Sequence, residues 1–184
     1  MKKNIRIAVA LVLLLALTLS AASAFAAVNS FTPANELNFK YMPFLGGQTF
    51  KVYSGPGRYY WRGANGWAKV YSDEAIYCAG DEGDWLLVQY YTSSGMRVGY
   101  VTKEDVSERV NATDLHFDYT TKRITRQCNF TDDPSSLNNP IGYLRAGDTV
   151  TYLSKFYNGF NWAYVETSIE GAPIRGFVPM DCIQ

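Results

Sequence analysis

Apolar and polar residues alternate along much of the chain after residue 35. Every second residue is apolar in ELNFKY (36–41), and DLHFDY (114–119) follows the same pattern. A period of two is that of a β-strand with one buried face. Further short runs such as WLLVQYY and TVTYL end at Gly, Asp, Asn or Pro, and we find no amphipathic stretch long enough for a helix after residue 26. The pattern predicts an all-β protein built from short strands.

The two alternating segments belong to an internal repeat. ELNFKY recurs as DLHFDY at a sequence offset of 114 − 36 = 78, and the tryptophans of DWLLVQY and NWAYVET differ by 162 − 85 = 77. The simplest explanation is the loss of one residue from a loop. The sequence therefore predicts two copies of a unit of about 70 residues, a size typical of a small barrel or sandwich. The first repeat is 36–106 and the second is 114–184, with a polar linker at 107–113.

The N-terminal segment at 1–26 has a different character. Lys2, Lys3 and Arg6 precede an apolar run at 7–19, and small residues in an A-x-A arrangement follow, with cleavage expected after Ala26 or Ala24. This is the pattern of a secretory signal peptide, and the run is shorter than the ~20 residues that a membrane span needs. An uncleaved anchor is the alternative. We expect a signal peptide at 1–26, a linker at 27–35, and a secreted, extracellular or wall-associated product without membrane contact after cleavage.

Charge and side-chain chemistry exclude several classes of function. The chain has seventeen basic and seventeen acidic residues, and removal of the leader leaves 14 − 17 = −3, so the basic surface that nucleic acid requires is missing. The single histidine, His116, and three cysteines have no spacing typical of a zinc site or a Cys–His hydrolase. We therefore predict no enzyme, no metal and no cofactor.

Both repeats carry motifs of one known family. FKVYSGPG and CNFTDDPSS resemble the opening strand and turn of bacterial SH3 domains, where the usual pattern is Leu-Asn-Val-Arg-x-Gly-Pro-Ser. DWLLVQY, VGYV and TKEDV follow in the first repeat, and IGYLRAGDTVTYL, NWAYV and RGFVPMDCI in the second, in that family's order. The family's arginine is replaced by Tyr53 and Thr131. The resemblance implies two tandem small SH3-like β-barrels.

The same resemblance implies a binding function. Bacterial SH3 domains commonly recognise cell-wall peptide or glycan, so peptidoglycan is the expected partner of a non-catalytic, monomeric protein. The alternative is a protein-interaction or assembly module that takes an extended peptide of an envelope or secreted partner.

Candidate ligand residues come from the turn after the first strand and from the tryptophan strands. In DWLLVQY and NWAYVET, the alternation places Leu86 with Val88 and Ala163 with Val165 on the core face, and leaves both tryptophans on the other face. A tryptophan that caps one barrel end is the alternative. The turn aromatics are concentrated in the first repeat, so if only one repeat binds the ligand, we expect it to be the first. The candidates are Tyr53, Tyr59, Tyr60, Trp61, Trp67, Trp85, Tyr143 and Trp162.

The cysteines predict a disulfide in the second repeat. Cys128 and Cys182 fall near its opening and closing strands, which closure of a barrel brings together, and export permits oxidation. The alternative is that Cys128, which matches Phe50, is simply a buried apolar residue. Cys78 is expected to be a core thiol.

Overall fold

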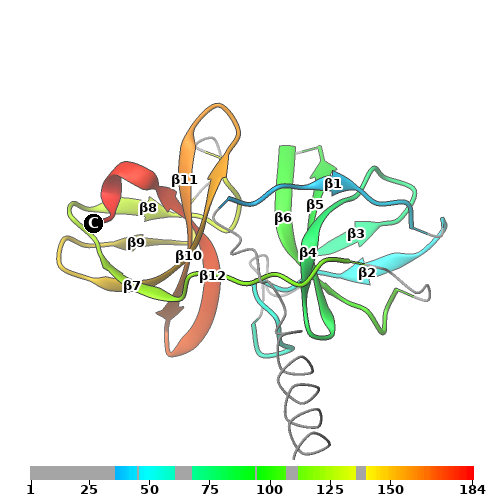
Figure 1. Ribbon diagram of the computed structural model, residues 1–184, viewed down its shortest axis with the longest axis horizontal. Helices are drawn as coiled ribbons and strands as arrows, with labels where there is room; N and C mark the ends of the chain where they lie inside the picture. The colour runs from blue at the N-terminus through cyan, green and yellow to red at the C-terminus, as the bar shows by residue number, and fades with distance from the viewer. Residues whose placement is uncertain (1–35, 45, 61–67, 94, 107–111, 136–139) are drawn as a thin grey trace, which may run out of the picture. The chain divides into compact units, whose positions relative to one another are not determined.

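The structure is a computed structural model, and it describes residues 36–44, 46–60, 68–93, 95–106, 112–135 and 140–184. These residues form antiparallel sheets and one short 3-10 helix, η1 (Met180–Cys182), so the predicted all-β class is confirmed (Figure 1). They belong to one compact unit, Pro33–Gln184. The predicted signal peptide, the linker at 27–35 and most of the linker at 107–113 lie outside the described residues. No helix among the described residues has the length and apolar character needed to cross a membrane.

The first repeat contains a four-stranded and a two-stranded sheet. The larger sheet has the order β1-β4-β5-β6, and β2 pairs with β3 in the smaller one. The strands are β1 (Lys40–Tyr41), β2 (Thr49–Lys51), β3 (Lys69–Tyr71), β4 (Tyr77–Glu82), β5 (Trp85–Thr92) and β6 (Gly95–Thr102).

The second repeat has the same topology. Its larger sheet has the order β12-β11-β10-β7, and β8 pairs with β9. The strands are β7 (Thr120–Arg123), β8 (Cys128–Phe130), β9 (Gly142–Leu144), β10 (Thr149–Tyr157), β11 (Asn161–Ile169) and β12 (Ala172–Pro179). No ladder among the described strands closes a sheet into a barrel. Single bridges, Tyr53 to Tyr100 and Thr131 to Phe177, join the segments that follow β2 and β8 to the last strand of each repeat.

The strand register shows where the two repeats differ in length. Phe50 pairs with Val70 and Cys128 with Leu144, sequence separations of 70 − 50 = 20 and 144 − 128 = 16, so the first repeat is longer by four between these strands. The difference is reversed in the next hairpin, where the β10–β11 connection of the second repeat is three residues longer than the β4–β5 connection of the first. The prediction of a single lost residue was therefore wrong: a loss of four and a gain of three give the same net offset.

Each repeat has its own apolar core. Leu86 and Val88 lie in the core of the first repeat, and Ala163 and Val165 in that of the second. This confirms the core face that strand alternation predicted. The glycine of the RGFV motif has a related role: a Cβ on Gly176 would lie 2.4 Å from the carbonyl oxygen of Thr131, so only glycine lets β12 approach the opening strand this closely.

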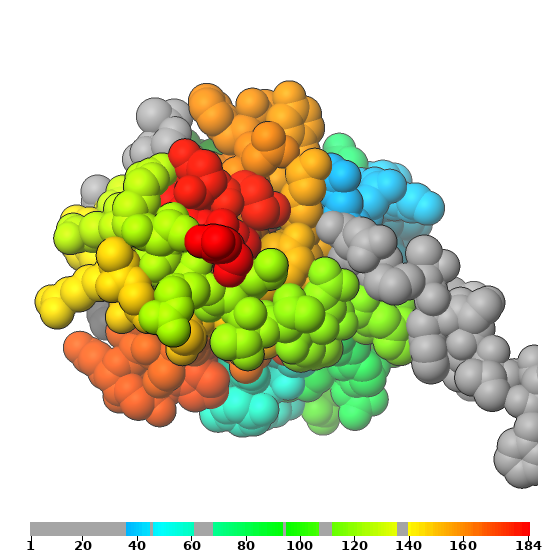
Figure 2. All heavy atoms as spheres, turned by 60° about the vertical axis from the view of Figure 1, so that its left-hand side comes forward, coloured from blue at the N-terminus to red at the C-terminus, as the bar shows by residue number. Residues whose placement is uncertain are grey.

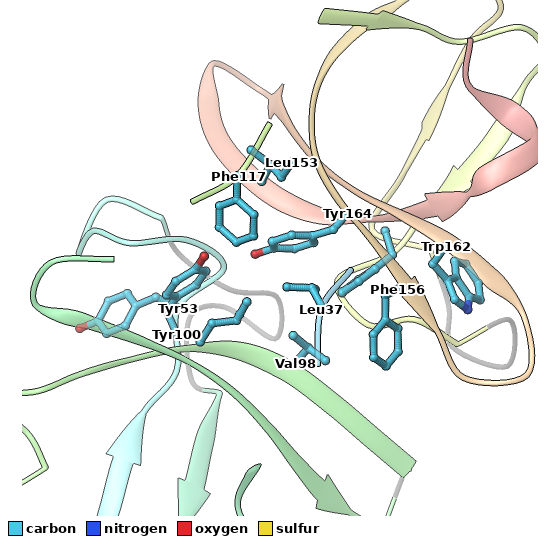
Figure 3. Close-up of a cluster of buried hydrophobic side chains, with 11 residues drawn as sticks. Leu37, Tyr53, Val98, Tyr100, Phe117, Leu153, Phe156, Trp162 and Tyr164 are labelled. Atoms are coloured by element: carbon cyan, nitrogen blue, oxygen red, sulfur yellow. The ribbon is translucent and has the colours of Figure 1, made fainter. Parts of the chain in front are cut away.

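The opposite faces of the two larger sheets meet each other in a third apolar cluster (Figure 3). Leu87, Val98 and Tyr100 come from the first repeat, and Tyr164 and Phe177 from the second, and all are buried. The register makes Leu87 the counterpart of Tyr164, and Tyr100 that of Phe177. The same face of each repeat therefore covers the other, and we call this cluster the repeat joint.

The N-terminal segment of each repeat crosses to the other repeat. The backbone N–H of Leu37 donates to the carbonyl of Lys155 over 2.7 Å, and that of Leu115 donates to the carbonyl of Asp81 over 2.7 Å. Both contacts belong to parallel bridges at equivalent places in the two sheets. The upstream motifs ELNFKY and DLHFDY thus tie each repeat to its partner.

A buried arginine crosses the repeat joint. Arg175, whose side chain is 3% exposed, is an ion-pair partner of Glu82 of the first repeat at 2.6 Å and of Glu166 at 2.7 Å, and it donates to the hydroxyl of Tyr100 over 2.9 Å. Burial acts to lower the pKa of Arg175, but Tyr100, Tyr164 and the carboxylates outweigh it, and the pKa is raised above its usual value. The guanidinium therefore stays charged and links both repeats.

The predicted disulfide between Cys128 and Cys182 is wrong for this structure, in which the described cysteines are free thiols. The expected proximity is present, since the two thiols share a hydrogen bond, and both are buried. Burial together with the neighbouring Cys128 raises the pKa of Cys182 to about 12, so the thiolate needed for oxidation is scarce. Cys78 lies in the core, as predicted.

We expect Arg175→Met to destabilise the protein by about 3–5 kcal/mol, because it leaves two carboxylates at the joint without their cation. Urea unfolding followed by circular dichroism measures this. Arg58→Met is the matched control, since the Arg58–Glu104 pair is exposed, and its unfolding midpoint should not move. Equal midpoints for both variants would contradict the structural role of Arg175.

Thiol counting tests the cysteine assignment. Unreduced protein should release three equivalents of thiol with Ellman's reagent in denaturant, and react much more slowly when native, because burial raises the pKa of Cys78 to about 11. A count of one instead of three would show that Cys128 and Cys182 are oxidised and contradict the assignment.

Candidate functional site

Four of the predicted ligand aromatics lie at the repeat joint or bridge the two repeats beside it: Tyr53, Trp85, Tyr60 and Trp162. Tyr53 is buried, and its ring centroid lies 5.1 Å from that of Trp85 in an edge-to-face contact. Trp85 is half-buried against the joint, and the backbone of Tyr53 forms a bridge with Tyr100. The two rings therefore pack inside the molecule. The second repeat covers the sheet face that strand alternation had left without a predicted partner.

Tyr60, the third, connects the turn of the first repeat to the second repeat. Its hydroxyl donates to Glu166 over 2.8 Å, and the guanidinium carbon of Arg175 lies 5.7 Å from its ring centroid. Burial, followed by the hydrogen bond to Glu166, raises the pKa of Tyr60 well above its usual value. The residue is 6% exposed, so it stabilises the joint and offers almost no surface to a ligand.

The other first-strand and turn candidates are scattered. Tyr59 is exposed, with its ring centroid 4.7 Å from that of Tyr60, and Tyr143 is exposed on β9, beside a shallow polar groove. Trp61 and Trp67 lie outside the described residues. The structure therefore does not bring Tyr59 and Tyr143 together into one site.

Trp162 belongs to the repeat joint and is 6% exposed, and it also lines a surface pocket in the second repeat. The pocket has a volume of about 520 Å³ and is formed by the end of the β10–β11 hairpin, the end of β12 and η1. Figure 2 shows the C-terminal turn and that hairpin on the same face. The indole N–H of Trp162 donates to Asn158 over 2.9 Å, which fixes the ring. The lining residues are Arg126, Phe160, Asn161, Trp162, Pro179, Met180 and Asp181.

The pocket combines apolar walls with one ion pair. Phe160 is 67% exposed on the hairpin and lines the pocket together with Pro179 and Met180. Arg126 donates to both carboxylate oxygens of Asp181 over 2.8 Å. This hydrogen bonding to Arg126 lowers the pKa of Asp181, so the pair stays ionised over the neutral range. Such a surface can hold an apolar group and offer a charged partner beside it.

The first repeat lacks the equivalent pocket walls. Its register places Thr102 opposite Trp85, where Pro179 lies opposite Trp162, and Lys103 follows where Met180 does. The β4–β5 turn consists of two residues, so no counterpart of Phe160 exists there. Among the described residues, the apolar pocket thus belongs to the second repeat, whereas the aromatic content of the sequence favoured the first.

Sequence reasoning named Trp162 as a candidate but not the other residues that line its pocket. Phe160 lies in the hairpin extension of the second repeat, and an alignment that allowed for this extension would have shown it as an aromatic residue without a core counterpart. Arg126 and Asp181 lie 55 positions apart in the sequence, and only the folded closing turn makes them neighbours.

The described residues include no group of three or more His, Cys, Asp or Glu side chains placed to hold a metal ion. What the pocket offers is binding surface, with an aromatic base, an apolar wall and an ion pair at its rim.

Comparisons with known proteins leave the family open. No family model matches the chain, and no curated protein matches it. Among solved structures, one described as the crystal structure of Ly7917 with the hydrolyzing product of MDP is similar over 77% of this chain and 61% of its own chain. Its sequence identity is 15% and its TM-score is 0.29, which is too low to carry an argument.

We expect stability to fall at alkaline pH through the joint tyrosines. Burial raises the pKa of Tyr60 and of Tyr100 above the unfolded value of about 10, so their contribution is complete below that pH and is lost as pH rises further. Urea midpoints measured from pH 8 to 11 should fall, and Tyr60→Phe should make the fall less steep. Tyr59→Phe is the matched control, and an identical slope in the two variants would contradict the assignment.

Proposed function

We propose that the protein is an exported, non-catalytic binding protein made of two bacterial SH3-like barrels, and that it recognises cell-wall material through the pocket around Trp162. The carrying observation is the placement of Trp162, Phe160 and Met180 around one open pocket beside the Arg126–Asp181 pair. Five ordered motifs in each repeat, with equivalent sheets, support the SH3-like assignment. The leader-like segment at 1–26 supports export.

The chemistry of the pocket suits the peptide stems of the wall. Such peptides carry small apolar side chains and free carboxylates at short spacing. The exposed ring of Phe160, beside the largely buried Trp162, gives flat apolar area for the small side chains. Arg126 is a planar donor for the carboxylates once it exchanges its contact with Asp181. Since the Arg126–Asp181 pair is exposed, the exchange costs little.

The repeat joint supports a role for the first repeat in holding this pocket. The buried cluster and Arg175 fix the two larger sheets to each other, so the second repeat is presented on a stable base. The alternative partner is an extended peptide of an envelope or secreted protein, and the crosslinking experiment below distinguishes it from cell-wall material.

We expect Phe160→Ser to weaken binding to purified wall sacculi about tenfold, because it removes an exposed aromatic wall of the pocket. Co-sedimentation of the chain with sacculi over a concentration series measures the apparent Kd. Tyr157→Ser is the matched control: it changes an exposed aromatic of the same hairpin that does not line the pocket, and binding should stay unchanged.

Two results would contradict the proposal. One is a native chain that does not co-sediment with sacculi under conditions in which an established wall binder does. The other is crosslinking that recovers a defined envelope polypeptide and no wall fragment, which would assign the pocket to the alternative partner.

A further inference from the structure

Three tyrosines form a row across the larger sheet of the first repeat. Tyr41 of β1 is paired with Tyr77 of β4, and Tyr77 is paired with Gln89 of β5, so these side chains share one face with Tyr91. Ring centroids are 5.9 Å apart between Tyr41 and Tyr77 and 6.5 Å apart between Tyr77 and Tyr91, both edge-to-face. We call these three residues the tyrosine row.

The tyrosine row continues the face that forms the repeat joint. Val98, which is paired with Gln89 on β6, is buried at the joint, whereas Tyr41 is 65% exposed and Tyr91 is 49% exposed. The rings therefore do not contribute a core. Contacts fix them in place nonetheless: neighbouring rings pack against each other, and the amide of Gln89 donates to the hydroxyl of Tyr91 over 3.2 Å. A fixed, accessible row of aromatic rings is a surface prepared for contact.

The chemistry of this face selects an uncharged ligand. Between Tyr41 and Tyr91 the register places tyrosines, Gln89 and Met96 on it, and none of these positions holds an acidic or basic side chain. A membrane surface or an acidic partner would require lysine or arginine on this face. A charged peptide would require side chains of the opposite charge there. A sugar ring instead offers an apolar C–H face to an aromatic ring and hydroxyls to phenol and amide groups.

We propose that the tyrosine row binds a linear, uncharged glycan, with successive sugar rings lying along successive tyrosines. This assigns a second binding surface, on the first repeat, that is separate from the pocket around Trp162. Taking the wall glycan as its natural ligand rests on the proposed function. The second repeat has Thr151 and Ser168 at the places of Tyr77 and Tyr91, so the surface is particular to the first repeat.

The test uses the full chain after its leader and a soluble tetramer of β-1,4-linked N-acetylglucosamine, with binding measured by isothermal titration calorimetry. We expect saturable binding, a loss of about tenfold in affinity for Tyr91→Ser, and no measurable binding for the variant with Tyr41, Tyr77 and Tyr91 all changed to serine. Tyr157→Ser changes an exposed tyrosine of the second repeat and should bind as the native chain does. Circular dichroism and urea midpoints establish that each variant is folded.

The results for the tetramer and for sacculi distinguish the tyrosine row from the pocket of the proposed function. Failure of the native chain to bind the tetramer, or unchanged binding by the triple variant, overturns the tyrosine row as a glycan site even if sacculi still bind through the pocket. Conversely, Phe160→Ser should leave binding of the tetramer unchanged, so loss of sacculus binding in that variant reports on the pocket alone. A chain that sediments as a dimer, and as a monomer in the triple variant, would assign the row to a second copy and overturn the inference.

Discussion

The contact between the second faces of the two larger sheets determines how the rest of the molecule is arranged. A four-stranded sheet in so small a repeat covers one face with its own core and leaves the other in need of a partner. Here the duplicated unit supplies that partner: Leu87 and Tyr164, equivalent residues of the two repeats, lie in the same cluster. The N-terminal segments reinforce the contact because each pairs with the sheet of the other repeat.

The joint is also where the two repeats cease to be equivalent. Arg175 has the place of Val98, and the place of Glu82 is taken by Phe156 in the second repeat. A buried charge is tolerated only when it is paired, so this ion pair fixes one arrangement of the repeats in a way that apolar packing alone does not. The repeat thus explains why the two sheet faces fit each other, and differences between the repeats at a few positions explain the ion pair between Arg175 and Glu82.

Away from the joint, the exposed surfaces of the two repeats differ. The second repeat has a longer hairpin and an apolar closing turn, which together make the pocket around Trp162. The first repeat has a short turn at that place and a tyrosine row on the part of its sheet that the joint leaves uncovered. If both surfaces engage one wall polymer, their fixed separation lets two weak contacts act together.

By itself the sequence determined the strand content, the repeat and the core face, because alternation with period two and a duplicated pattern are local properties of the chain. The pairs Leu86 with Val88 and Ala163 with Val165 were correctly placed for that reason. Tertiary structure alone decided which aromatic residues are accessible: strand alternation shows that Trp162 and Tyr164 lie on the second face, but not what covers it. Burial of Tyr53 and Tyr60, and the meeting of Arg126 with Asp181, depend on contacts between residues distant in sequence, which no local pattern encodes.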